Sequence, residues 1–570
     1  MAEEVWMLQT KKADFKQIGA RFQIDPVTAR IIRNRGIEGE AAIDRYLNGT
    51  LDDLYDPMLL KDMDRAVSIL CEAVDTGKKI RIVGDYDIDG VCSTYILLQA
   101  FERLGGDVDF EIPDRIKDGY GINESIIEQA HADGVEVILT CDNGISAFHQ
   151  VELAKKYGMT VVITDHHEVP LDGEKEKIPP ADAVIDPKQA DCPYPFPEIC
   201  GAVVAYKLVQ VLYARRGVPQ AEWLDLLEFA AIATVGDVMK LQDENRILVK
   251  YGLKKMAQTK NLGLRRLAEK NNLDLGAITA YHIGFVIGPC LNAGGRLKTA
   301  KEALALLRAQ SEEEAERLAE ELKELNDTRK DMTEQGTEAA KLQVESWYQK
   351  DKVLVVFLPE CHESLAGIIA GRLREYYQKP AIVLTSGEEA VKGSGRSIDE
   401  YHMFKKLTEV SDLLLKFGGH PLAAGLSLEE KNIDEFRRRL NENAGLTEED
   451  FKAKVWIDVP MPVGYVTERL VRELSCLEPF GQGNEKPLFA EKSLRIRASR
   501  VLGRNRNVVK MTLEETDGHA IEALYFGDGT TFEEERAGRR EIDVVYYPDI
   551  NEYNGRKTLQ AVIRRYKFRG

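Results

Sequence analysis

The chain has 570 residues, of which 44% are hydrophobic and 30% are charged, and its formal net charge is −18 at pH 7. A chain of this length holds two to four domains with sizeable cores. The negative charge weighs against nucleic-acid binding by the whole surface, although local basic patches decide such binding. The eight cysteines include no CxxC pair, which argues against zinc ribbons and a disulfide framework.

No apolar run approaches the roughly 18 residues that a membrane-spanning helix needs. The first residues, MAEEVWMLQTKK, lack the basic and apolar stretches of a signal peptide. Together with the scattered cysteines, these features predict a cytoplasmic protein that has no membrane partner.

The first half of the chain is predicted to form a single α/β lobe. Residues 1–75 show helical spacing of apolar positions without a chemical motif, and we expect them to form an N-terminal cap on this lobe. Residues 76–310 alternate strands with helices and then become helical, which predicts a mostly parallel sheet. The expected strands are 80–83, 108–112, 135–141, 160–164 and 183–185.

Three further segments follow this lobe. Residues 311–347 are charged, contain glycine only at Gly336 and carry leucine and alanine at helical spacing, which predicts a long connecting helix. A second α/β unit is expected over residues 348–447. Residues 448–570 contain short alternating β runs separated by turn residues, which favours a small OB-like β-barrel.

The most informative stretch is 79–94, KIRIVGDYDIDGVCST, in which a β-branched strand leads into an acidic loop and then a helix. Asp85, Asp87 and Asp89 alternate in this loop, and such close carboxylates repel one another unless a cation or hydrogen bonds stabilise them. An EF-hand loop begins in the same way but needs a glutamate at its twelfth position, which here is Ile96. Because ligands bind at the carboxyl edge of parallel sheets, we expect this loop to form part of a site.

Three other segments deliver acids or imidazoles where an apolar run stops. A single aspartate after a strand is usually a helix cap, but four such clusters together favour a shared site. Carboxylates with one or two imidazoles and no thiolate favour Mn²⁺ or Mg²⁺, and a pair of these ions is the usual device for attack on phosphorus. The pattern therefore predicts metal-assisted phosphoester hydrolysis. The additional residues are Asp142, the run Asp165-His166-His167, and Asp237.

A phosphoester substrate also needs cationic or amide groups that hold it. Each candidate arginine by itself is more often a surface residue, but adjacent glycines would let backbone N–H groups approach an anion closely. The candidates are Arg115 in IPDR, Arg296 in LNAGGRL, the turn Ser394-Gly395-Arg396-Ser397, and Gly418-Gly419-His420.

These motifs carry a resemblance to a known family. DYDIDG, DNG, DHH and GGH resemble the motif series of the DHH phosphoesterase superfamily, which has DHH and DHHA1 lobes. IPDRIKDGYG, CGAVVAYKL, TVGDV, IGPCLNAGGRL, SGRS, FGGHPLAAGL and PFGQGN resemble the RecJ family of single-strand-specific exonucleases, from about residue 50 to the C-terminus. The resemblance implies 5′→3′ degradation of single-stranded DNA to 5′-mononucleotides with two Mn²⁺ or Mg²⁺ ions, in DNA repair and recombination.

The resemblance also implies roles for residues and partners. The partners would be single-stranded DNA, a helicase and a single-strand-binding protein, and the protein would act as a monomer. Arg115, Arg296, Ser394, Arg396 and His420 would bind substrate phosphates. The metal ligands would be Asp87, Asp89, Asp142, His166 and Asp237, with Asp85, Asp165 and His167 as catalytic neighbours.

Two segments depart from the family pattern. The family form of 288–296 is closer to GPRLNAAGR, whereas this chain has Cys290 and Gly294 there and keeps Arg296. The family element WHxGVxGIVA appears as CHESLAGIIA, which keeps His362 in different surroundings. These departures bear on local packing and on details of the second lobe.

The C-terminal segment supplies independent support for a DNA substrate. Seven basic residues fall between 492 and 510, and the single nearby acid is Glu491. Basic residues with neighbouring aromatics on an OB-like barrel suit a single strand, although a charged barrel rim is the plainer alternative. The arginines expected to bind DNA are Arg495, Arg497, Arg500, Arg504 and Arg506.

Two other functions stay open from the sequence. The chain could be a DHH-family phosphodiesterase of short oligonucleotides or cyclic dinucleotides, whose members usually lack a C-terminal barrel. It could also be a non-catalytic DNA-binding scaffold, against which the full set of aspartates and histidines speaks. Digestion of long single strands and the metal content would separate these alternatives.

Overall fold

The computed structural model describes residues 4–553 and 555–569, which form two units. The first unit contains residues 54–239 and 247–453, and the second contains residues 4–53, 240–246 and those from 454 onward. Within the described chain, no helix is both long enough and apolar enough to span a bilayer.

The first lobe of the first unit is built on a five-stranded parallel sheet in the order β3-β2-β4-β5-β8. Its central strands are buried on both faces, as expected for a parallel sheet that helices cover. The α/β class and the mostly parallel sheet predicted from the sequence are confirmed. The strands are β2 (Ile80–Val83), β3 (Val108–Glu111), β4 (Val137–Cys141), β5 (Thr160–Thr164) and β8 (Ala183–Ile185).

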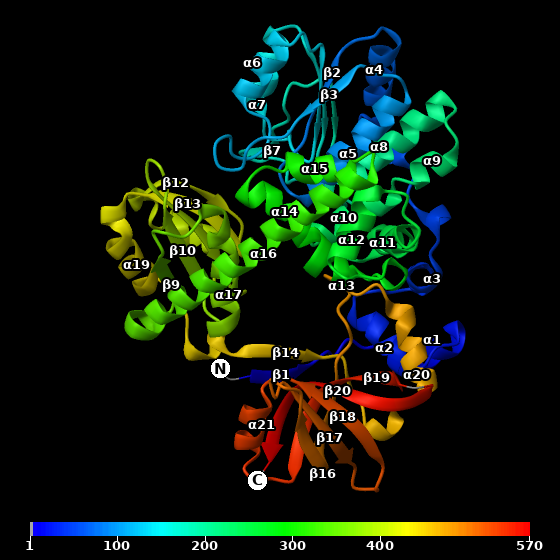
Figure 1. Ribbon diagram of the computed structural model, residues 1–570, viewed down its shortest axis with the longest axis vertical. Helices are drawn as coiled ribbons and strands as arrows, with labels where there is room; N and C mark the ends of the chain where they lie inside the picture. Colours follow the sequence, from blue (N-terminus) through cyan, green and yellow to red (C-terminus); the bar gives the residue numbers. More distant parts are fainter. Residues whose placement is uncertain (1–3, 554, 570) are drawn as a thin grey trace. The chain divides into compact units, whose positions relative to one another are not determined.

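Helices cover both faces of this sheet (Figure 1). One layer packs around α5 and α8, which lie side by side, and the other contains α6 and α7. All four clusters of candidate site residues belong to this lobe. Three of them follow the carboxyl ends of β2, β4 and β5, and the fourth follows the end of α10. The helices are α4 (Met63–Asp75), α5 (Ile88–Arg103), α6 (Glu124–Ala132), α7 (Phe148–Lys156), α8 (Gly201–Arg216), α9 (Gln220–Leu224) and α10 (Leu227–Gly236).

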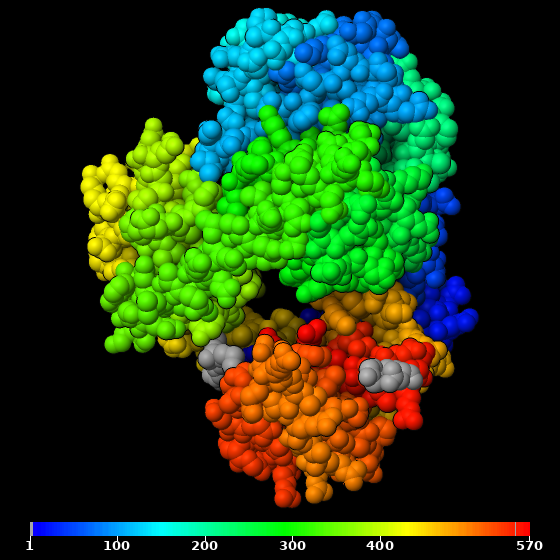
Figure 2. All heavy atoms as spheres, viewed as in Figure 1, coloured from blue at the N-terminus to red at the C-terminus, as the bar shows by residue number. Residues whose placement is uncertain are grey.

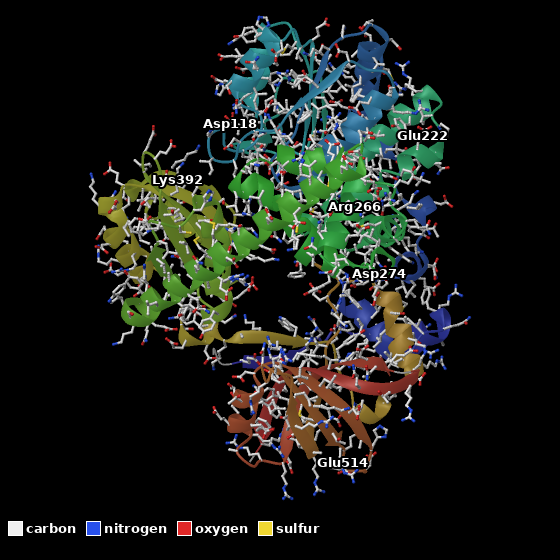
Figure 3. All side chains as sticks on the ribbon, in the orientation of Figure 1. Asp118, Glu222, Arg266, Asp274, Lys392 and Glu514 are labelled. Carbon is white, nitrogen blue, oxygen red and sulfur yellow. The ribbon has the colours of Figure 1, made fainter. Side chains whose placement is uncertain are left out.

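A long helix, α16 (Glu312–Gln343), connects the two lobes and confirms the predicted connecting helix. Ser311 caps it by accepting a hydrogen bond from the Glu314 amide at 3.2 Å. Arg266, labelled in Figure 3, pairs with Glu312 on α16 at 2.8 Å. The neighbouring helices are α11 (Asp243–Met256), α12 (Leu262–Lys270), α13 (Ala280–His282), α14 (Gly288–Leu297) and α15 (Lys301–Leu307), with a π-helical turn over Ile283–Ile287.

The second lobe is a five-stranded mixed sheet in the order β12-β13-β11-β10-β9, in which only β9 and β10 are parallel. Helix α17 packs against both this sheet and α16, and in Figure 2 the yellow-green atoms of the lobe lie against the green atoms of the long helix. The elements are β9 (Leu354–Phe357), α17 (Ala366–Tyr377), β10 (Ala381–Ser386), β11 (Val391–Arg396), α18 (Met403–Thr408), β12 (Leu414–Gly419), β13 (Ala423–Leu428) and α19 (Ile433–Glu442).

The second unit contains a six-stranded sheet in the order β15-β16-β17-β18-β20-β19. Strand β16 also pairs with β19, which closes the sheet into a barrel and confirms the OB-like prediction. The strands are β15 (Val459–Pro460), β16 (Phe489–Leu502), β17 (Val508–Glu514), β18 (Ala520–Phe526), β19 (Glu541–Tyr553) and β20 (Arg556–Arg569), with helices α20 (Glu468–Leu474) and α21 (Gly529–Arg536).

The N-terminal segment differs from the expected cap on the first lobe. Residues 54–75, which include α4, belong to the first unit, whereas residues 4–53 belong to the barrel unit. Ile31 and Ile32 share one hydrophobic core with Phe489 and Val544 of the barrel. The amphipathic pattern of this segment showed which positions are buried, but not which partner covers them. Its elements are β1 (Glu4–Leu8), α1 (Phe15–Phe22), α2 (Pro26–Asn34) and α3 (Glu40–Asn48), and β1 pairs with β14 (Ala453–Ile457).

Glu228 on α10 is a buried acid outside the candidate site, and its side chain makes stability depend on pH. Glu228 is 5% exposed, and its Oε1 accepts a hydrogen bond from Thr259 at 2.7 Å. Burial raises its pKa to about 7 from an ordinary value of 4.5, against the opposing effect of Thr259. The folded protein therefore binds a proton more tightly than the unfolded chain, and stability is lost as pH rises through about 7.

We expect Glu228→Gln to remove this loss. Relative to wild type, its free energy of unfolding should rise by about 3 kcal/mol between pH 4 and pH 8. Urea unfolding at both pH values measures the change. The control is Glu334→Gln, at an exposed position of α16. An equal pH dependence in wild type and Glu228→Gln would contradict the assignment.

Candidate active site

The acidic loop after β2 is held by its own backbone. The side chain of Asp87 caps α5, because its Oδ1 accepts hydrogen bonds from the amides of Asp89 at 2.9 Å and Gly90 at 3.1 Å. A Cβ atom at Gly90 would lie 2.4 Å from the Asp85 carbonyl oxygen, so only glycine allows this turn. Asp85 and Asp89 are each 1% exposed. The loop thus brings two carboxylates into the protein interior, with the half-buried Asp87 between them.

The amino end of α8 holds Asp89. The amides of Gly201 and Ala202 donate to its two carboxylate oxygens at 2.7 Å each. A helix amino end attracts negative charge, so the amino end of α8 is a suitable partner for this buried carboxylate. Gly201 also lies against Asp142, and a Cβ atom there would be 2.7 Å from the Asp142 Cβ. Sequence reasoning missed Gly201, although a glycine that opens an apolar helix is a signal of such a close approach.

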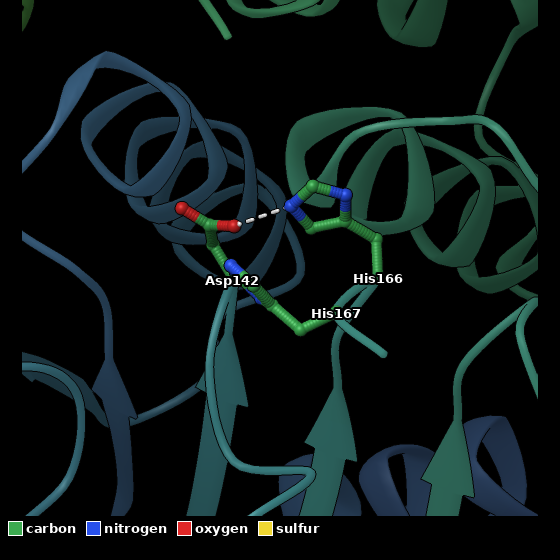
Figure 4. A group of neighbouring side chains, drawn as sticks. All are labelled: Asp142, His166 and His167. Carbon is green, nitrogen blue, oxygen red and sulfur yellow. Dashed lines mark ion pairs between the residues drawn. The ribbon is translucent and has the colours of Figure 1, made fainter. Parts of the chain in front are cut away.

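Asp142 and His166 meet at the ends of β4 and β5 (Figure 4). The Nε2 atom of His166 lies 3.0 Å from Asp142 Oδ1, 3.5 Å from Asp89 Oδ2 and 3.8 Å from Asp237 Oδ2. Asp142 has a left-handed backbone with φ of 61°, which turns the chain immediately after the strand. Side chains from all four predicted clusters therefore converge on one imidazole.

His167 belongs to a second arrangement beside the first. Its Nδ1 lies 2.7 Å from Asp165 Oδ1, and the Tyr120 hydroxyl lies 3.1 Å from the imidazole. Burial lowers the pKa of His167, whereas the Asp165 hydrogen bond and the surrounding carboxylates raise it, to about 9 overall. The Tyr120 hydroxyl also donates to the Asp142 carbonyl at 2.9 Å. Sequence reasoning singled out the IPDRIKDGYG motif but assigned no role to Tyr120.

The cluster fits a divalent-cation centre. The cluster contains three groups of three residues, and within each group the possible ligand atoms lie within 4.8 Å of one another. The first group shares His166 with the second and Asp142 with the third. Within the described residues, Asp85 Oδ2 is buried without a hydrogen-bond partner, and the polar contact of Asp142 Oδ1 is the 3.0 Å ion pair with His166. Burial and the neighbouring carboxylates raise the pKa of Asp142 well above its usual range. The groups are Asp142-His166-His167, Asp89-His166-Asp237 and Asp85-Asp87-Asp142.

Burial and the charges of Asp89 and Asp87 likewise raise the pKa of Asp237 to about 8. Buried carboxylates that lack both a cation and a full set of donors are costly to ionise. Carboxylate oxygens with imidazole nitrogen, and no thiolate, are the donors that Mn²⁺ and Mg²⁺ accept. The donor set and the unpartnered Asp85 Oδ2 atom therefore both match such ions.

A cationic cavity of about 620 Å³ in the same unit begins at the acidic loop, since Tyr86 lines it. Four predicted phosphate-binding residues come together here, and Lys392, labelled in Figure 3, lines the same cavity. Burial, followed by the charges of Arg115 and Arg329, lowers the pKa of Arg296 to about 10. The four predicted residues are Arg115, Arg296, Ser394 and Arg396.

The cavity is shaped for an anion. Arg396 Nη1 donates to Ser394 Oγ at 3.2 Å, and the Arg115 guanidinium lies 4.7 Å from the centre of the Tyr86 ring. A Cβ atom at Gly367 would lie 2.8 Å from Arg396 Nη2, so the amino end of α17 approaches these side chains with bare backbone. Guanidinium groups and helix amino ends are the usual phosphate-binding groups of proteins.

Other predicted residues lie elsewhere. His420 is exposed at the turn between β12 and β13 and is not among the residues that line this cavity. The five predicted DNA-binding arginines lie on β16 or on the turn that follows it, in the second unit, where they are largely exposed. His362 remains near the cavity, with its Nδ1 2.8 Å from Ser364 Oγ.

Comparison with known protein families finds three domain models along the chain. The DHH family N-terminal domain matches residues 79–234, the DHHA1 domain matches 350–445, and the RecJ OB domain matches 457–565. These matches cover the first lobe, the second lobe and the barrel in turn.

Curated relatives match nearly the whole chain. The single-stranded-DNA-specific exonuclease RecJ of Bacillus subtilis is 36% identical over 98% of this chain and 70% of its own length. The protein with the same name from Haemophilus influenzae is 33% identical over 96% of this chain and 97% of its own length.

A solved structure agrees with the fold. The crystal structure of RecJ in complex with Mn²⁺ from Thermus thermophilus matches with a TM-score of 0.84 and 28% identity, covering 99% of this chain and 79% of that chain. A structure of that protein with Mg²⁺ matches with a TM-score of 0.77. The acidic site, the three domain models and the sequence identity over nearly the whole chain agree, and the chain belongs to the RecJ family.

Proposed function

We propose that this protein degrades single-stranded DNA from its 5′ end to 5′-mononucleotides, in DNA repair and recombination. The observation that carries the proposal is the continuity between the carboxylate–imidazole cluster and the cationic cavity. Tyr86 lies between Asp85 and Asp87 in the chain and lines the cavity itself. A phosphate in the cavity therefore places the next phosphodiester of the strand near the cluster.

One set of residues would hold the metal ions, and another set would hold and orient the strand. Asp87, Asp89, Asp142, His166 and Asp237 would hold two Mn²⁺ or Mg²⁺ ions. Such ions, when bound, activate water and neutralise charge on the attacking and leaving oxygens.

The chain's own groups orient the substrate. The Asp165 carboxylate orients the His167 imidazole through the Nδ1 atom, and the Tyr120 hydroxyl lies 3.1 Å from Nε2. A phosphate oxygen that binds at Nε2 would share this nitrogen with the Tyr120 hydroxyl. Arg115, Arg296 and Arg396 would hold the terminal 5′ phosphate. We assign the polarity of digestion to this cavity, since it would hold the terminal phosphate.

The direct test is digestion of a long single-stranded DNA that carries a distinct label at each end. Reactions contain Mn²⁺, Mg²⁺ or EDTA, and a blunt duplex of the same sequence is the control. We expect metal-dependent release of mononucleotides from the 5′ end, little digestion of the duplex and none in EDTA.

Other outcomes would contradict the proposal in distinct ways. Cleavage of di- and trinucleotides or cyclic dinucleotides without digestion of the long strand would keep the metal chemistry and exclude the exonuclease. Tight DNA binding without any cleavage or metal uptake would indicate a scaffold. Release from the 3′ end would overturn the role of the arginine cavity.

Arg396→Ala tests the end-recognition role. Loss of one charged hydrogen-bonding group should cost about 2 kcal/mol, or a roughly 30-fold rise in KM for a strand with a 5′ phosphate. A strand with a 5′ hydroxyl should be affected far less. The variant should fold normally, because burial and the charge of Arg115 already lower the pKa of Arg396, so its removal relieves repulsion.

The matched control for Arg396→Ala is Arg438→Ala, on the exposed face of α19, where its guanidinium pairs within its own helix at Glu435 and Glu442. KM and kcat are measured for both strands. An equal rise in KM for the phosphate and hydroxyl strands would show that Arg396 does not recognise the end.

We also propose a cytoplasmic monomer. All eight cysteines have free thiols, which suits a reducing compartment. A nuclease of single strands needs another activity, of the helicase class, to separate duplex DNA. A single-strand-binding protein would cover the single strand that this separation exposes. Light scattering should give a mass near 64.1 kDa, and a doubled mass would contradict the monomer.

A further inference from the structure

A second cavity lies entirely within the barrel unit and has no part in the site described above. Its volume is about 560 Å³. It lies where the ribbon of β1 and β14, the N-terminal helices and the end of β20 meet, and the Gln9 amide donates to the Ile457 carbonyl at 2.9 Å along one wall. The basic side chains that line it are Arg35, Lys454, Lys486, Arg564 and Arg565.

The two acids of this cavity are already engaged. Asp458 accepts hydrogen bonds from Arg35 Nη1 at 2.7 Å and Nη2 at 3.2 Å, and both side chains are less than 10% exposed. Glu485 accepts from the Gly483 amide at 3.0 Å. The Arg35–Asp458 pair therefore forms a buried, neutral part of the wall, and Arg565 is paired with Glu4 at 2.6 Å. The positive charge on which the inference rests is that of Lys486 and Arg564.

Lys486 and Arg564 are the cations best placed for an anion. The ammonium group of Lys486 lies 3.6 Å from the centre of the Tyr547 ring. Burial, followed by the opposing influences of Asp549 and the Arg564 charge, leaves the pKa of Lys486 below its ordinary value. Arg564 is exposed near the end of β20. Two neighbouring cations that repel each other gain from an anion placed between them.

An aromatic ring lies beside these charges. Trp456, on β14, lines the cavity and is 46% exposed, although large aromatic side chains are usually mostly buried. Exposed aromatic rings on which bases stack, flanked by cations that contact the phosphates, are how proteins bind single strands without reading sequence. An acidic peptide would match the charge but would leave the ring without a planar partner.

We propose that this cavity binds a nucleotide unit of single-stranded DNA, with its base stacked on Trp456 and its phosphate between Lys486 and Arg564. This inference rests on the proposed function for the identity of the strand. It gives the N-terminal segment, through Arg35 and Gln9, a part in building a DNA-binding site. This contact is separate from the arginines of β16.

The test uses the full-length protein in EDTA, so that the strand stays intact, and a fluorescein-labelled oligomer of 20 thymidines. Fluorescence anisotropy gives the Kd from 50 to 300 mM NaCl for wild type, Trp456→Ala, Trp456→Phe and the double variant Lys486→Ala/Arg564→Ala. The matched controls are Trp347→Ala, at a ring that is 72% exposed in the first unit, and Lys431→Ala, whose side chain is 75% exposed. Circular dichroism melts confirm that each variant folds.

We expect Trp456→Ala to raise Kd about tenfold, within the range for loss of one stacked base, and Trp456→Phe to restore most of the affinity. The double variant should lower the slope of log Kd against log salt by about 0.7 for each phosphate group that the protein no longer neutralises. Neither control should change Kd or the slope.

Wild-type affinity and salt slope in both the Trp456 and the double variants would overturn the inference. Poly-glutamate binding that falls in the double variant as much as DNA binding does, with no effect of Trp456→Ala, would assign the cavity to an acidic peptide instead. Digestion of the same strand by wild type with Mn²⁺ runs in parallel. Reduced variant binding without any wild-type digestion would contradict the proposed nuclease alone, and digestion with unchanged variant binding would contradict this inference alone.

Discussion

Asp142→Asn is expected to lower kcat for single-stranded DNA by at least about 1,000-fold while leaving the fold intact. Asparagine preserves the shape of the side chain and removes one charge from a cluster in which Asp142 Oδ1 is buried beside His166. The effect is large because the other four carboxylates of these groups cannot replace a ligand lost from a residue that two of the groups share.

Without metal, the stability of Asp142→Asn should equal or exceed that of wild type, although its kcat falls. Without metal, the charged form of Asp142 is disfavoured by burial and by the neighbouring Asp89, Asp87 and Asp85. The pKa of Asp142 is therefore raised in the folded state, and stability is lost as pH rises above the pKa of the unfolded chain. In EDTA at pH 8, Asp142→Asn should melt at or above the wild-type temperature.

In Mn²⁺, wild type should melt at a higher temperature than Asp142→Asn. A ligand at 100 times its Kd stabilises the folded state by about 2.7 kcal/mol, and this gain should appear in wild type and be lost in Asp142→Asn. Asp237→Asn should behave alike with a smaller change in EDTA, because the Asp237 side chain is 30% exposed. The control is Asp331→Asn, at an exposed position of α16. Near wild-type turnover, or full Mn²⁺ stabilisation of Asp142→Asn, would exclude this residue as a ligand.

Gly201→Ala should abolish metal-dependent digestion although it adds only one methyl group. The new Cβ atom would lie 2.7 Å from the Asp142 Cβ and 2.8 Å from its Oδ1, closer than such atoms approach in proteins. Either Asp142 or the amino end of α8 must move. Movement of the helix would also lengthen the 2.7 Å hydrogen bonds that hold Asp89.

The measurements for Gly201→Ala are Mn²⁺ binding by calorimetry and the digestion rate. We expect metal affinity to fall at least about tenfold and digestion to fall further, because both depend on the spacing of Asp89 and Asp142. The matched control is Gly284→Ala, whose Cβ would meet only Val235 at an ordinary 3.7 Å. Unchanged metal affinity in Gly201→Ala would show that the close approach is not needed for the site.

The strands of the first lobe were predictable because the pattern that marks them is local. The expected strands at 160–164 and 183–185 coincide with β5 and β8. Each is a short β-branched run between turn residues, and parallel strands end at the same edge of a sheet. The same rule predicted that Asp142 and His166 lie together, whereas Asp237 reaches them from the end of helix α10.

The N-terminal segment and the supports of the site were not predictable in this way. Ile31 and Ile32 show by their spacing that one helix face is buried, but the barrel that buries it is more than 400 residues away in sequence. The amides that hold Asp89 come from residues 112 and 113 positions later. Tyr120 contacts His167 from the loop that connects β3 to α6.

The sequence by itself therefore determined the α/β class, the acidic strand ends and the family resemblance, because periodicity, turn residues and motifs are local properties. Only the tertiary structure decided that α8 holds Asp89, that the arginines meet at one cavity, and that Trp456 borders a second one. Those contacts depend on which buried faces pack together. Hydrophobic burial favours covering each apolar face but does not, by pattern alone, specify the partner.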